Sequence, residues 1–366
     1  MSNAKIRSQK QTSIGNKVGI CVSNAILLAL SILLAMAAGE LALRVAVRFK
    51  CLPRDRGFAA FALQSDVRRI YVRGAYDGND LGLFRETPGS KLRWEPVPSA
   101  HAGAIRINAG GFRGPDVYFL PVQGVTRIAI LGDSQAFGMN LAESDTLAGA
   151  LERKLNTTSR KGKFEVLNFG VPGYNTQQEM LVFRQKVLAY HPSFIVLYYS
   201  LNDPEIPDNT VFLGSGPLSS SYLYMLAVYS FKVHSSMADL RRESRDLVDY
   251  YIRLHESVYF TRCAELIRQM AAESESHGAL FYLVIAPEVN GFEHFASYPY
   301  EAIHARVRDL ESGPLRVIDP LTSFKSAYDS PVTLWVNDND THFNAVAQSL
   351  VADLVAKRIL SETISQ

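Results

Sequence analysis

The chain has 366 residues, 47% of them hydrophobic and 20% charged, and a formal net charge of +2. This length allows one large domain with accessory segments, and the balanced charge does not indicate a nucleic-acid partner. The three cysteines, Cys21, Cys51 and Cys263, form no CxxC motif and no cluster with histidine at zinc spacing, so no structural zinc site is predicted. Cys51 and Cys263 could form a disulfide only where the fold brings them together.

The amino-terminal segment has the features of a membrane anchor. Residues 1–17 are polar and basic, and residues 18–38 then form a long apolar run without a charge. An α-helix of that length spans roughly 31 Å, about the thickness of a hydrocarbon core. The sequence therefore predicts a basic tail over 1–17 and a transmembrane helix over 18–47. A cleaved signal peptide and a buried core helix are the alternatives.

A lead-in segment with short strands is predicted over residues 48–124, because glycines and prolines divide it into short pieces. In one of these pieces, apolar and polar residues alternate briefly around residue 106 and turn-forming residues follow, a pattern typical of a small hairpin. Its Asn108 and Arg113 could face a ligand. The simpler interpretation is that they hold the turn and a surface ion pair.

From residue 125 onward, strand-like and helical patterns alternate. Apolar runs with strand character fall at 127–131, 164–168, 194–199, 280–285 and 315–318. Helical periodicity falls at 145–156, 176–190, 258–276, 299–310 and 344–361. This alternation predicts an α/β domain over 125–366 with a parallel sheet covered on both sides, interrupted by an insertion at about 205–257.

A serine follows directly after the first predicted strand. The apolar run ends in Gly132, Asp133 and Ser134, and a helical pattern comes next. Glycine at a strand end permits a sharp turn, which can hold a serine hydroxyl clear of the sheet as a nucleophile. The same tripeptide is also an ordinary strand-ending turn, so it indicates catalysis only together with other segments.

Two further segments would meet this serine at the carboxyl edge of the sheet, where sites of open α/β sheets form. After the second strand come Gly170 and Gly173, either of which can offer a backbone N–H to an oxyanion. The segment also fits a plain loop with a helix cap. After the third strand comes Asn202, whose amide can donate to the same oxyanion, although alone it would indicate a turn.

An aspartate and a histidine are predicted to lie in a loop just before the last helix. Asp340 stands two residues before His342, so its carboxylate can orient the imidazole through Nδ1 and leave Nε2 to take a proton from a serine. Asp338 is the alternative acid. None of the other histidines combines a strand-to-helix loop with adjacent acids.

These elements, in this chain order, make the sequence resemble the SGNH hydrolases, also called the GDSL esterase family, in their membrane-anchored bacterial form. The resemblance covers roughly residues 125–362 and implies a flavodoxin-like three-layer sandwich with a parallel sheet. It implies a catalytic triad of Ser134, His342 and Asp340. The implied oxyanion donors are the backbone N–H groups of Ser134 and Gly173 and the side chain of Asn202.

The chain departs from the family's pattern in two blocks. The third block usually reads Gly-x-Asn-Asp, whereas here Ser200 replaces the glycine, which is expected to narrow the site and to leave Asn202 in place. The last block often reads Asp-x-x-His, which would put the acid at Asn339. The Asp-x-His form occurs in membrane-linked and periplasmic relatives that act on polysaccharide O-acetyl groups, and it favours Asp340.

The implied function is that of a membrane-anchored serine esterase. It would hydrolyse an acyl ester, such as an O-acetyl group on a glycan, through an acyl-enzyme on Ser134 and without a metal or organic cofactor. The implied location is a single pass through the lipid bilayer with the catalytic domain outside the cytoplasm, in the periplasm. A polysaccharide O-acyltransferase with the same triad and an inactive glycan-binding scaffold module are the alternatives.

Overall fold

The structure is a computed structural model, and it describes residues 24, 26–46, 49, 83–87, 93–159, 162–205, 221–224, 226–227, 240–241, 243–338 and 340–365. The predicted tail 1–17, the first part of the predicted anchor, residues 50–82 of the lead-in, most of the predicted insertion, Cys21 and Cys51 lie outside these residues. The chain divides into two units. One comprises Met1–Arg68 with Val211–Val233, and the other comprises Arg69–Thr210 with His234–Gln366.

The larger unit is built on a parallel sheet of five strands in the order β6-β5-β7-β8-β9. The strands are β5 (Val125–Gly132), β6 (Lys163–Asn168), β7 (Phe194–Tyr199), β8 (Leu280–Ile285) and β9 (Leu315–Ile318). Numbered along the chain, this order is 2-1-3-4-5, the flavodoxin-like order. The predicted fold class is therefore confirmed, and each apolar run with strand character forms one of these strands.

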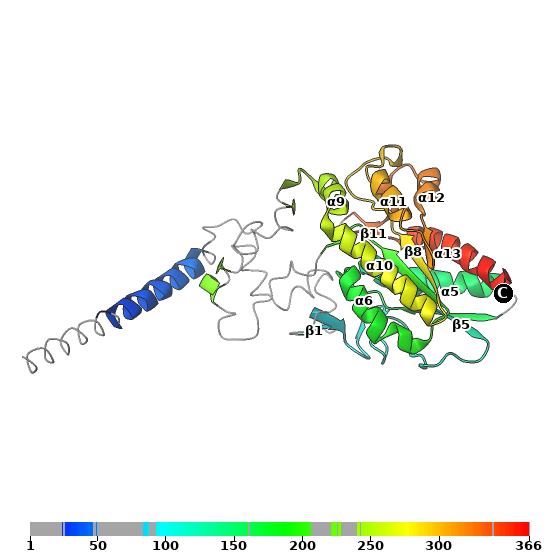
Figure 1. Cartoon of the computed structure of the whole chain (residues 1–366), viewed down its shortest axis with the longest axis horizontal. Coiled ribbons are helices and arrows are strands. Elements are labelled where there is room, and N and C mark those ends of the chain that lie inside the picture. Colours follow the sequence, from blue (N-terminus) through cyan, green and yellow to red (C-terminus); the bar gives the residue numbers. More distant parts are fainter. Residues whose placement is uncertain are drawn as a thin grey trace, which may run out of the picture. The chain divides into compact units, whose positions relative to one another are not determined.

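Helices cover both faces of the sheet (Figure 1). α5 (Leu147–Thr158) and α13 (Ala345–Ser365) pack together on one face, while α6 (Thr176–Gln185) and α10 (Val258–Ser276) pack together on the other. Because both faces are covered, every residue of β7 is buried. Each of these helices corresponds to a predicted pattern, with ends shifted by a few residues where a capping side chain sets the start.

Short elements complete the larger unit. The other helices are α4 (Ser134–Phe137), α9 (Leu247–Glu256), α11 (Glu301–Arg308) and α12 (Leu321–Ala327), with 3-10 turns at Glu143–Asp145, Val187–Tyr190, Phe295–Ser297 and Pro331–Leu334. Three antiparallel pairs join β1 (Phe84–Thr87) to β2 (Arg93–Pro96), β3 (His101–Ala102) to β4 (Ile105–Arg106), and β10 (Trp335–Asn337) to β11 (Asp340–Phe343). Among these short elements, the sequence predicts only α11, as the helical pattern at 299–310, and short strands within the lead-in segment.

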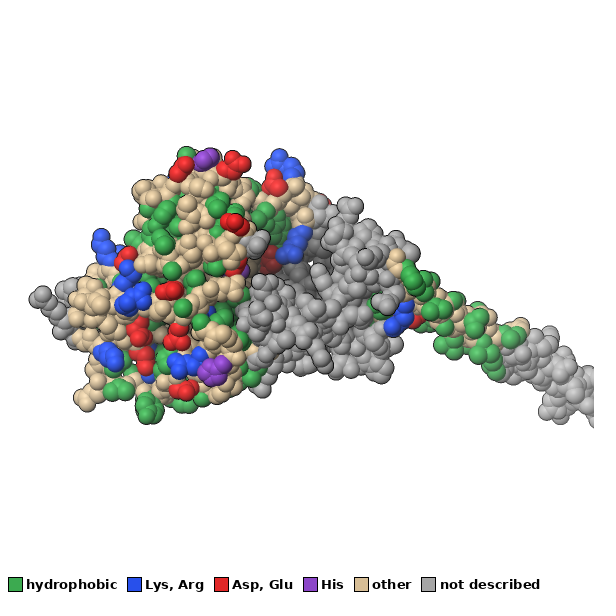
Figure 2. Space-filling model, turned by 180° about the vertical axis from the view of Figure 1, so that it is seen from behind, with side chains coloured by type: hydrophobic (Ala, Val, Ile, Leu, Met, Phe, Trp, Pro, Cys, Tyr) green, Lys and Arg blue, Asp and Glu red, His purple; other side chains and the backbone are tan. Residues whose placement is uncertain are grey.

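The smaller unit contains the apolar helix Ile26–Ala46, which is long and apolar enough to span a membrane or to be a signal sequence. Its large apolar side chains are exposed, and Figure 2 shows them along this helix. Near its end, Glu40 forms an ion pair with Arg44 at 2.7 Å and accepts the backbone N–H groups of Tyr222 and Leu223, each at 2.9 Å. The first described turn of the insertion is therefore fixed to this helix.

Candidate active site

Ser134 is the first residue of α4, which starts directly at the end of β5, the strand between β6 and β7. The sharp turn requires glycine at position 132, because φ there is +147° and a Cβ would lie 2.8 Å from the carbonyl oxygen of Tyr198. Asp133 caps the short helix, since its Oδ1 accepts the N–H of Gln135 at 2.8 Å. The turn and the cap together hold the serine at the carboxyl edge of the sheet.

Ser134, His342 and Asp340 form one hydrogen-bonded line. His342 Nε2 lies 2.9 Å from Ser134 Oγ, and His342 Nδ1 lies 2.5 Å from Asp340 Oδ1. The alternative acid, Asp338, is exposed in the turn between β10 and β11. In such a line the imidazole can take the serine proton while the carboxylate stabilises the imidazolium.

The expectation that Asp340 and His342 lie in a loop is wrong. Both belong to β11, which pairs with β10, and α13 begins only at Ala345. The hairpin is tied to the nucleophile segment, because the N–H of Phe343 donates to the side-chain oxygen of Gln135 at 3.1 Å. A strand fixes the spacing of alternate side chains, so it places the acid and the imidazole more firmly than a loop would.

Opposing effects set the protonation of this pair. Burial lowers the pKa of His342, but the hydrogen bond and charge of Asp340, together with the charges of Asp133 and Glu288, raise that pKa above its ordinary value of 6.5. Burial raises the pKa of Asp340, yet hydrogen bonds from His342 and Asn140 outweigh it and bring the pKa to about 2. The site therefore combines an ionised carboxylate with an imidazole of increased proton affinity, which suits a general base.

Of the two candidate oxyanion glycines, the contacts favour Gly173. It is exposed with a φ of +74°, and among the hydrogen bonds of the described residues none engages its N–H or that of Ser134. Gly170 instead donates its N–H to Asn168 Oδ1 at 3.0 Å, and a Cβ there would lie 2.4 Å from the backbone nitrogen of Phe137. Gly170 thus serves the close packing of the loop on α4.

The expectation that Ser200 narrows the site is wrong. Its side chain is buried, and its hydroxyl donates to Asp133 Oδ1 at 3.0 Å. Burial raises the pKa of Asp133, while hydrogen bonds that include those of Ser200 and Asn202 oppose the rise. Asn202 is partly exposed beside this carboxyl group. Because a carboxamide has two N–H donors, one can serve Asp133 while the other remains for an oxyanion.

Two buried acids lie beneath these oxyanion segments. Glu179 on α6 and Asp203 after β7 have carboxyl oxygens that are buried, and burial, together with the charge of Asp133, raises the pKa of each carboxyl well above its ordinary value. Their segments are also joined by the backbone, since the N–H of Thr176 donates to the carbonyl of Asp203 at 3.3 Å. A neutral acid can donate a hydrogen bond that a carboxylate cannot, so protonation suits this buried position.

The expected surface ion pair of Arg113 is wrong. This side chain is buried, and its guanidinium donates to the carbonyl oxygens of Phe137, Gly138 and Leu141 at 2.9, 2.7 and 2.5 Å. The carbonyls at the end of a helix lack intrahelical partners, so the lead-in segment supplies the donors that α4 requires. Asn108 is also buried and, as expected, holds the turn through hydrogen bonds to neighbouring backbone groups.

Sequence reasoning missed Asn140 as a member of the site. Its Nδ2 donates to Asp340 Oδ2 at 2.6 Å, so the triad carboxylate is held from both sides. The residue has a φ of +55°, a conformation that asparagine tolerates better than most residues. An asparagine just after Gly138 in a short turn was the available signal.

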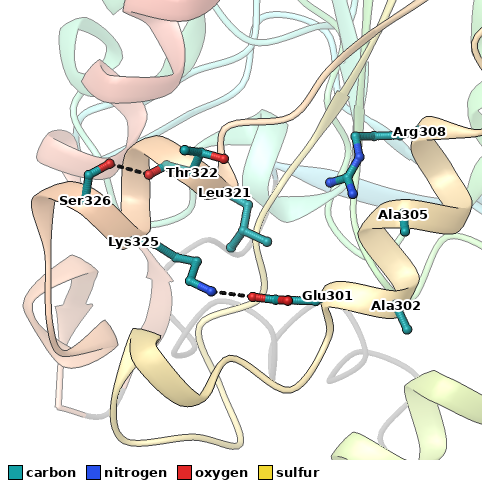
Figure 3. Close-up of a pocket in the computed structure, with 8 residues that line it drawn as sticks. All are labelled: Glu301, Ala302, Ala305, Arg308, Leu321, Thr322, Lys325 and Ser326. Atoms are coloured by element: carbon teal, nitrogen blue, oxygen red, sulfur yellow. Dashed lines mark hydrogen bonds and ion pairs between the residues drawn. The ribbon is translucent and has the colours of Figure 1, made fainter.

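Elsewhere in the described part of the larger unit, the contacts show no comparable arrangement. A pocket lies between α11 and α12, and its lining includes the ion pair of Glu301 and Lys325 (Figure 3). None of the site residues described above lines this pocket. Among the described residues, no group of three or more His, Cys, Asp or Glu side chains could hold a metal ion.

Comparisons with known proteins give only distant likenesses. No protein-family model matches the chain, and no curated protein matches it. The solved structures to which it is similar include the lipase/acylhydrolase from Enterococcus faecalis, at 17% identity and a TM-score of 0.40, covering 65% of this chain and 96% of that one.

They also include the acetyl xylan esterase AlAXEase, at 13% identity and a TM-score of 0.40, covering 64% of this chain and 99% of that one. A third is the acetylxylan esterase Axe2 from Geobacillus stearothermophilus, at 12% identity and a TM-score of 0.41, covering 64% of this chain and 94% of that one. Likeness at this level carries no weight for the chemistry, which rests on the geometry of the site.

Proposed function

We propose that the chain is a serine esterase of the SGNH type that hydrolyses an acyl ester. The observation that carries the proposal is the line of hydrogen bonds from Ser134 Oγ through His342 to Asp340, at 2.9 and 2.5 Å. A serine hydroxyl alone is a weak nucleophile at neutral pH. An adjacent base that is itself oriented by a third group activates it.

The proposed reaction has two halves. His342 Nε2 takes the proton of Ser134 as Oγ attacks the ester carbonyl carbon, and the resulting oxyanion is held by the N–H groups of Ser134 and Gly173 and the amide of Asn202. Each such donor contributes about 3 kcal/mol in comparable sites. His342 then returns the proton to the departing alcohol, and a water molecule, deprotonated in the same way, attacks the acyl-enzyme and releases the acid.

We also propose that the enzyme is a single-pass membrane protein. The helix Ile26–Ala46 exposes its large apolar side chains, and a hydrocarbon environment would remove that surface from water. The catalytic domain is proposed to lie in the periplasm. An anchored enzyme there would meet acylated glycans of the cell surface.

The test of the esterase is covalent labelling of the serine. A fluorophosphonate probe is expected to add one adduct to Ser134, located by mass spectrometry of the digested protein, and Ser134→Ala or His342→Ala is expected to lower ester turnover about 10³-fold or more. Ser144→Ala, which removes an exposed serine hydroxyl, is the matched control and should label normally. Wild-type turnover by the Ser134→Ala protein would overturn the proposal.

A further inference from the structure

Glu288 presents one fixed and one open carboxylate oxygen at the carboxyl edge of the sheet. It follows β8, and its Oε1 accepts the N–H of Val289 and both the N–H and Nδ2 of Asn290 at 2.9, 2.9 and 2.7 Å. Oε2 takes part in none of the hydrogen bonds between described residues and is not among their buried unpaired atoms. Burial raises the pKa of Glu288, and the hydrogen bonds from Asn290 and Val289 oppose the rise. Because the side chain is partly exposed, Oε2 remains as an acceptor for a ligand.

The loop that carries this acid is docked on the hairpin that carries the proposed base. Asn290 Nδ2 donates to Thr341 Oγ1 at 3.1 Å, and Thr341 directly precedes His342. The carbonyl of Val289 accepts the indole N–H of Trp335 in β10 at 3.2 Å. The negative charge of Glu288 is close enough to act on the imidazole, since it helps to raise the pKa of His342.

An aromatic residue, Tyr251, is linked through Tyr300 to the loop that carries this acid. The ring of Tyr251 on α9 packs edge-on against Tyr300 with 6.0 Å between centroids, and the hydroxyl of Tyr300 donates to the carbonyl of Asn290 at 2.9 Å. Burial, and next the charge of Glu288, raises the pKa of the Tyr251 hydroxyl. Tyr251 is partly exposed, and none of the hydrogen bonds between described residues uses its hydroxyl.

The helix that carries Tyr251 is rigidly attached to the sheet. His255 Nδ1 lies 2.8 Å from the carbonyl of Tyr251, and His255 Nε2 lies 2.7 Å from the hydroxyl of Tyr199 at the end of β7. Burial lowers the pKa of His255 to about 4, so the imidazole is neutral and can donate at Nδ1 while it accepts at Nε2. Tyr251 is therefore held at a defined position next to the loop that carries the acid.

We propose that Glu288 and Tyr251 form a subsite for the alcohol part of the ester, and that this alcohol carries several hydroxyl groups, as a sugar does. The proposal rests on the esterase function proposed above. A hydroxyl that donates to a carboxylate forms a strong, charge-assisted hydrogen bond, and a tyrosine adds a second polar partner and an apolar ring. An acyl chain offers no donor and would leave the carboxylate desolvated without a partner, so the acid suits the alcohol side.

The test compares two acetyl esters that differ only in hydroxyl groups. The first is methyl 6-O-acetyl-glucopyranoside, and the second is (6-methoxytetrahydropyran-2-yl)methyl acetate, which keeps the ring and the methoxy group but lacks the hydroxyls. The quantity measured is the ratio of their kcat/KM values, taken at a pH on the plateau of each variant's profile. Glu288→Gln keeps the fixed oxygen and replaces Oε2 by an amide, and it should lower this ratio by about tenfold or more.

Two further variants sharpen the test. Tyr251→Phe removes only the hydroxyl and should lower the ratio by about threefold, which keeps the proposal testable should Glu288→Gln fail to fold. Glu301→Gln, an exposed acid of α11, is the matched control and should leave the ratio at its wild-type value.

The outcomes separate the subsite from the esterase function. If Ser134 labels with the fluorophosphonate but the folded variants keep the wild-type ratio, the subsite is wrong and the esterase stands. If Ser134 of the wild-type protein does not label, the esterase function fails and the subsite fails with it.

Discussion

Three acidic residues raise the pKa of His342. Asp340 binds its Nδ1, and Asp133 and Glu288 act on the ring from the nucleophile turn and from the loop after β8. These charges favour the imidazolium and outweigh the effect of burial. The same charges that stabilise the proposed transition state therefore also make the base easier to protonate at low pH.

This balance predicts the acid limb of the pH–rate profile. The neutral imidazole is the active form of the base, so kcat/KM should fall as pH falls through the pKa of His342, at a pH above 6.5. Asp340→Asn removes the main group that raises this pKa, so the limb should move to lower pH while kcat falls by about 10⁴. Initial rates with p-nitrophenyl acetate would measure both effects. They should be taken between about pH 5 and pH 9, a range that includes the pH values at which histidine titrates.

Asp338→Asn is the matched control for that experiment. The side chain of Asp338 is exposed in the turn between β10 and β11, so its removal should leave the rate and the acid limb near their wild-type values. A crippling effect of Asp338→Asn together with a mild effect of Asp340→Asn would show that the acid has been assigned to the wrong residue.

Among the elements, α4 depends most on a distant part of the chain. It has four residues, too few to be stable alone, and it is held by its cap at Asp133 and by Arg113 at its other end. The amide of Gln348 on α13 also donates to the carbonyl of Gln135 at 2.9 Å. A short helix bound from both ends is a rigid support for the hydroxyl of its first residue.

Arg113→Lys is expected to destabilise the larger unit by about 2–4 kcal/mol, because a buried ammonium cannot match the three carbonyls that the planar guanidinium binds. Urea unfolding followed by tryptophan fluorescence would measure the loss, since both tryptophans, Trp94 and Trp335, belong to this unit. Arg106→Lys, a partly exposed side chain 3.9 Å from Glu143, is the control and should cost less than about 0.5 kcal/mol. Equal losses in the two variants would contradict the role given to Arg113.

The elements that sequence could predict are those with a long hydrophobic signal. The five strands of the main sheet are apolar runs, and α5, α6, α10 and α13 repeat apolar residues at helical spacing. α4 is only about one helical turn long, too short for an apolar residue to recur on one face, and the polar residues of β11 are typical of a loop, so neither could be recognised. Arg113 was placed at the surface because arginine is rarely buried, and only tertiary contacts reveal the carbonyls that it satisfies.

The site was predictable in its parts but not in its arrangement. The chain positions of Ser134, Asp340 and His342 follow from their places near strand ends and the last helix, and the structure brings their side chains together. Their catalytic roles remain predictions. The turn after Gly138 marks Asn140 only as a turn residue, and Glu288 carries no local motif, so only the fold could bring them to the site.

At the scale of the whole molecule, the apolar helix Ile26–Ala46 is the feature behind the proposed membrane location. We expect the full chain to sediment with membranes and to resist extraction by alkaline carbonate, because its exposed apolar side chains prefer hydrocarbon to water. Removal of residues 1–50 should yield a soluble protein that still labels at Ser134. Immunoblots of membrane and soluble fractions, with amino-terminal sequencing, would measure this.

Recovery of the full chain in the soluble fraction, with Met1 or Ser2 as its first residue, would contradict the anchor. Recovery of a soluble chain that begins near Gly39 would instead identify the segment as a cleaved signal peptide.

The lead-in segment also sets the order in which the site can be completed during synthesis. Trp94 donates its indole N–H to the carbonyl of Pro172 at 3.1 Å, accepts the hydroxyl of Tyr174 at its own carbonyl, and lies against Gly173. Trp94 and Tyr174 are 80 residues apart, so at ribosomal rates the tryptophan is made about 4 to 16 s before its partner. A nascent chain therefore cannot form these contacts until that delay has passed, so the proposed oxyanion loop lacks the support of Trp94 until then.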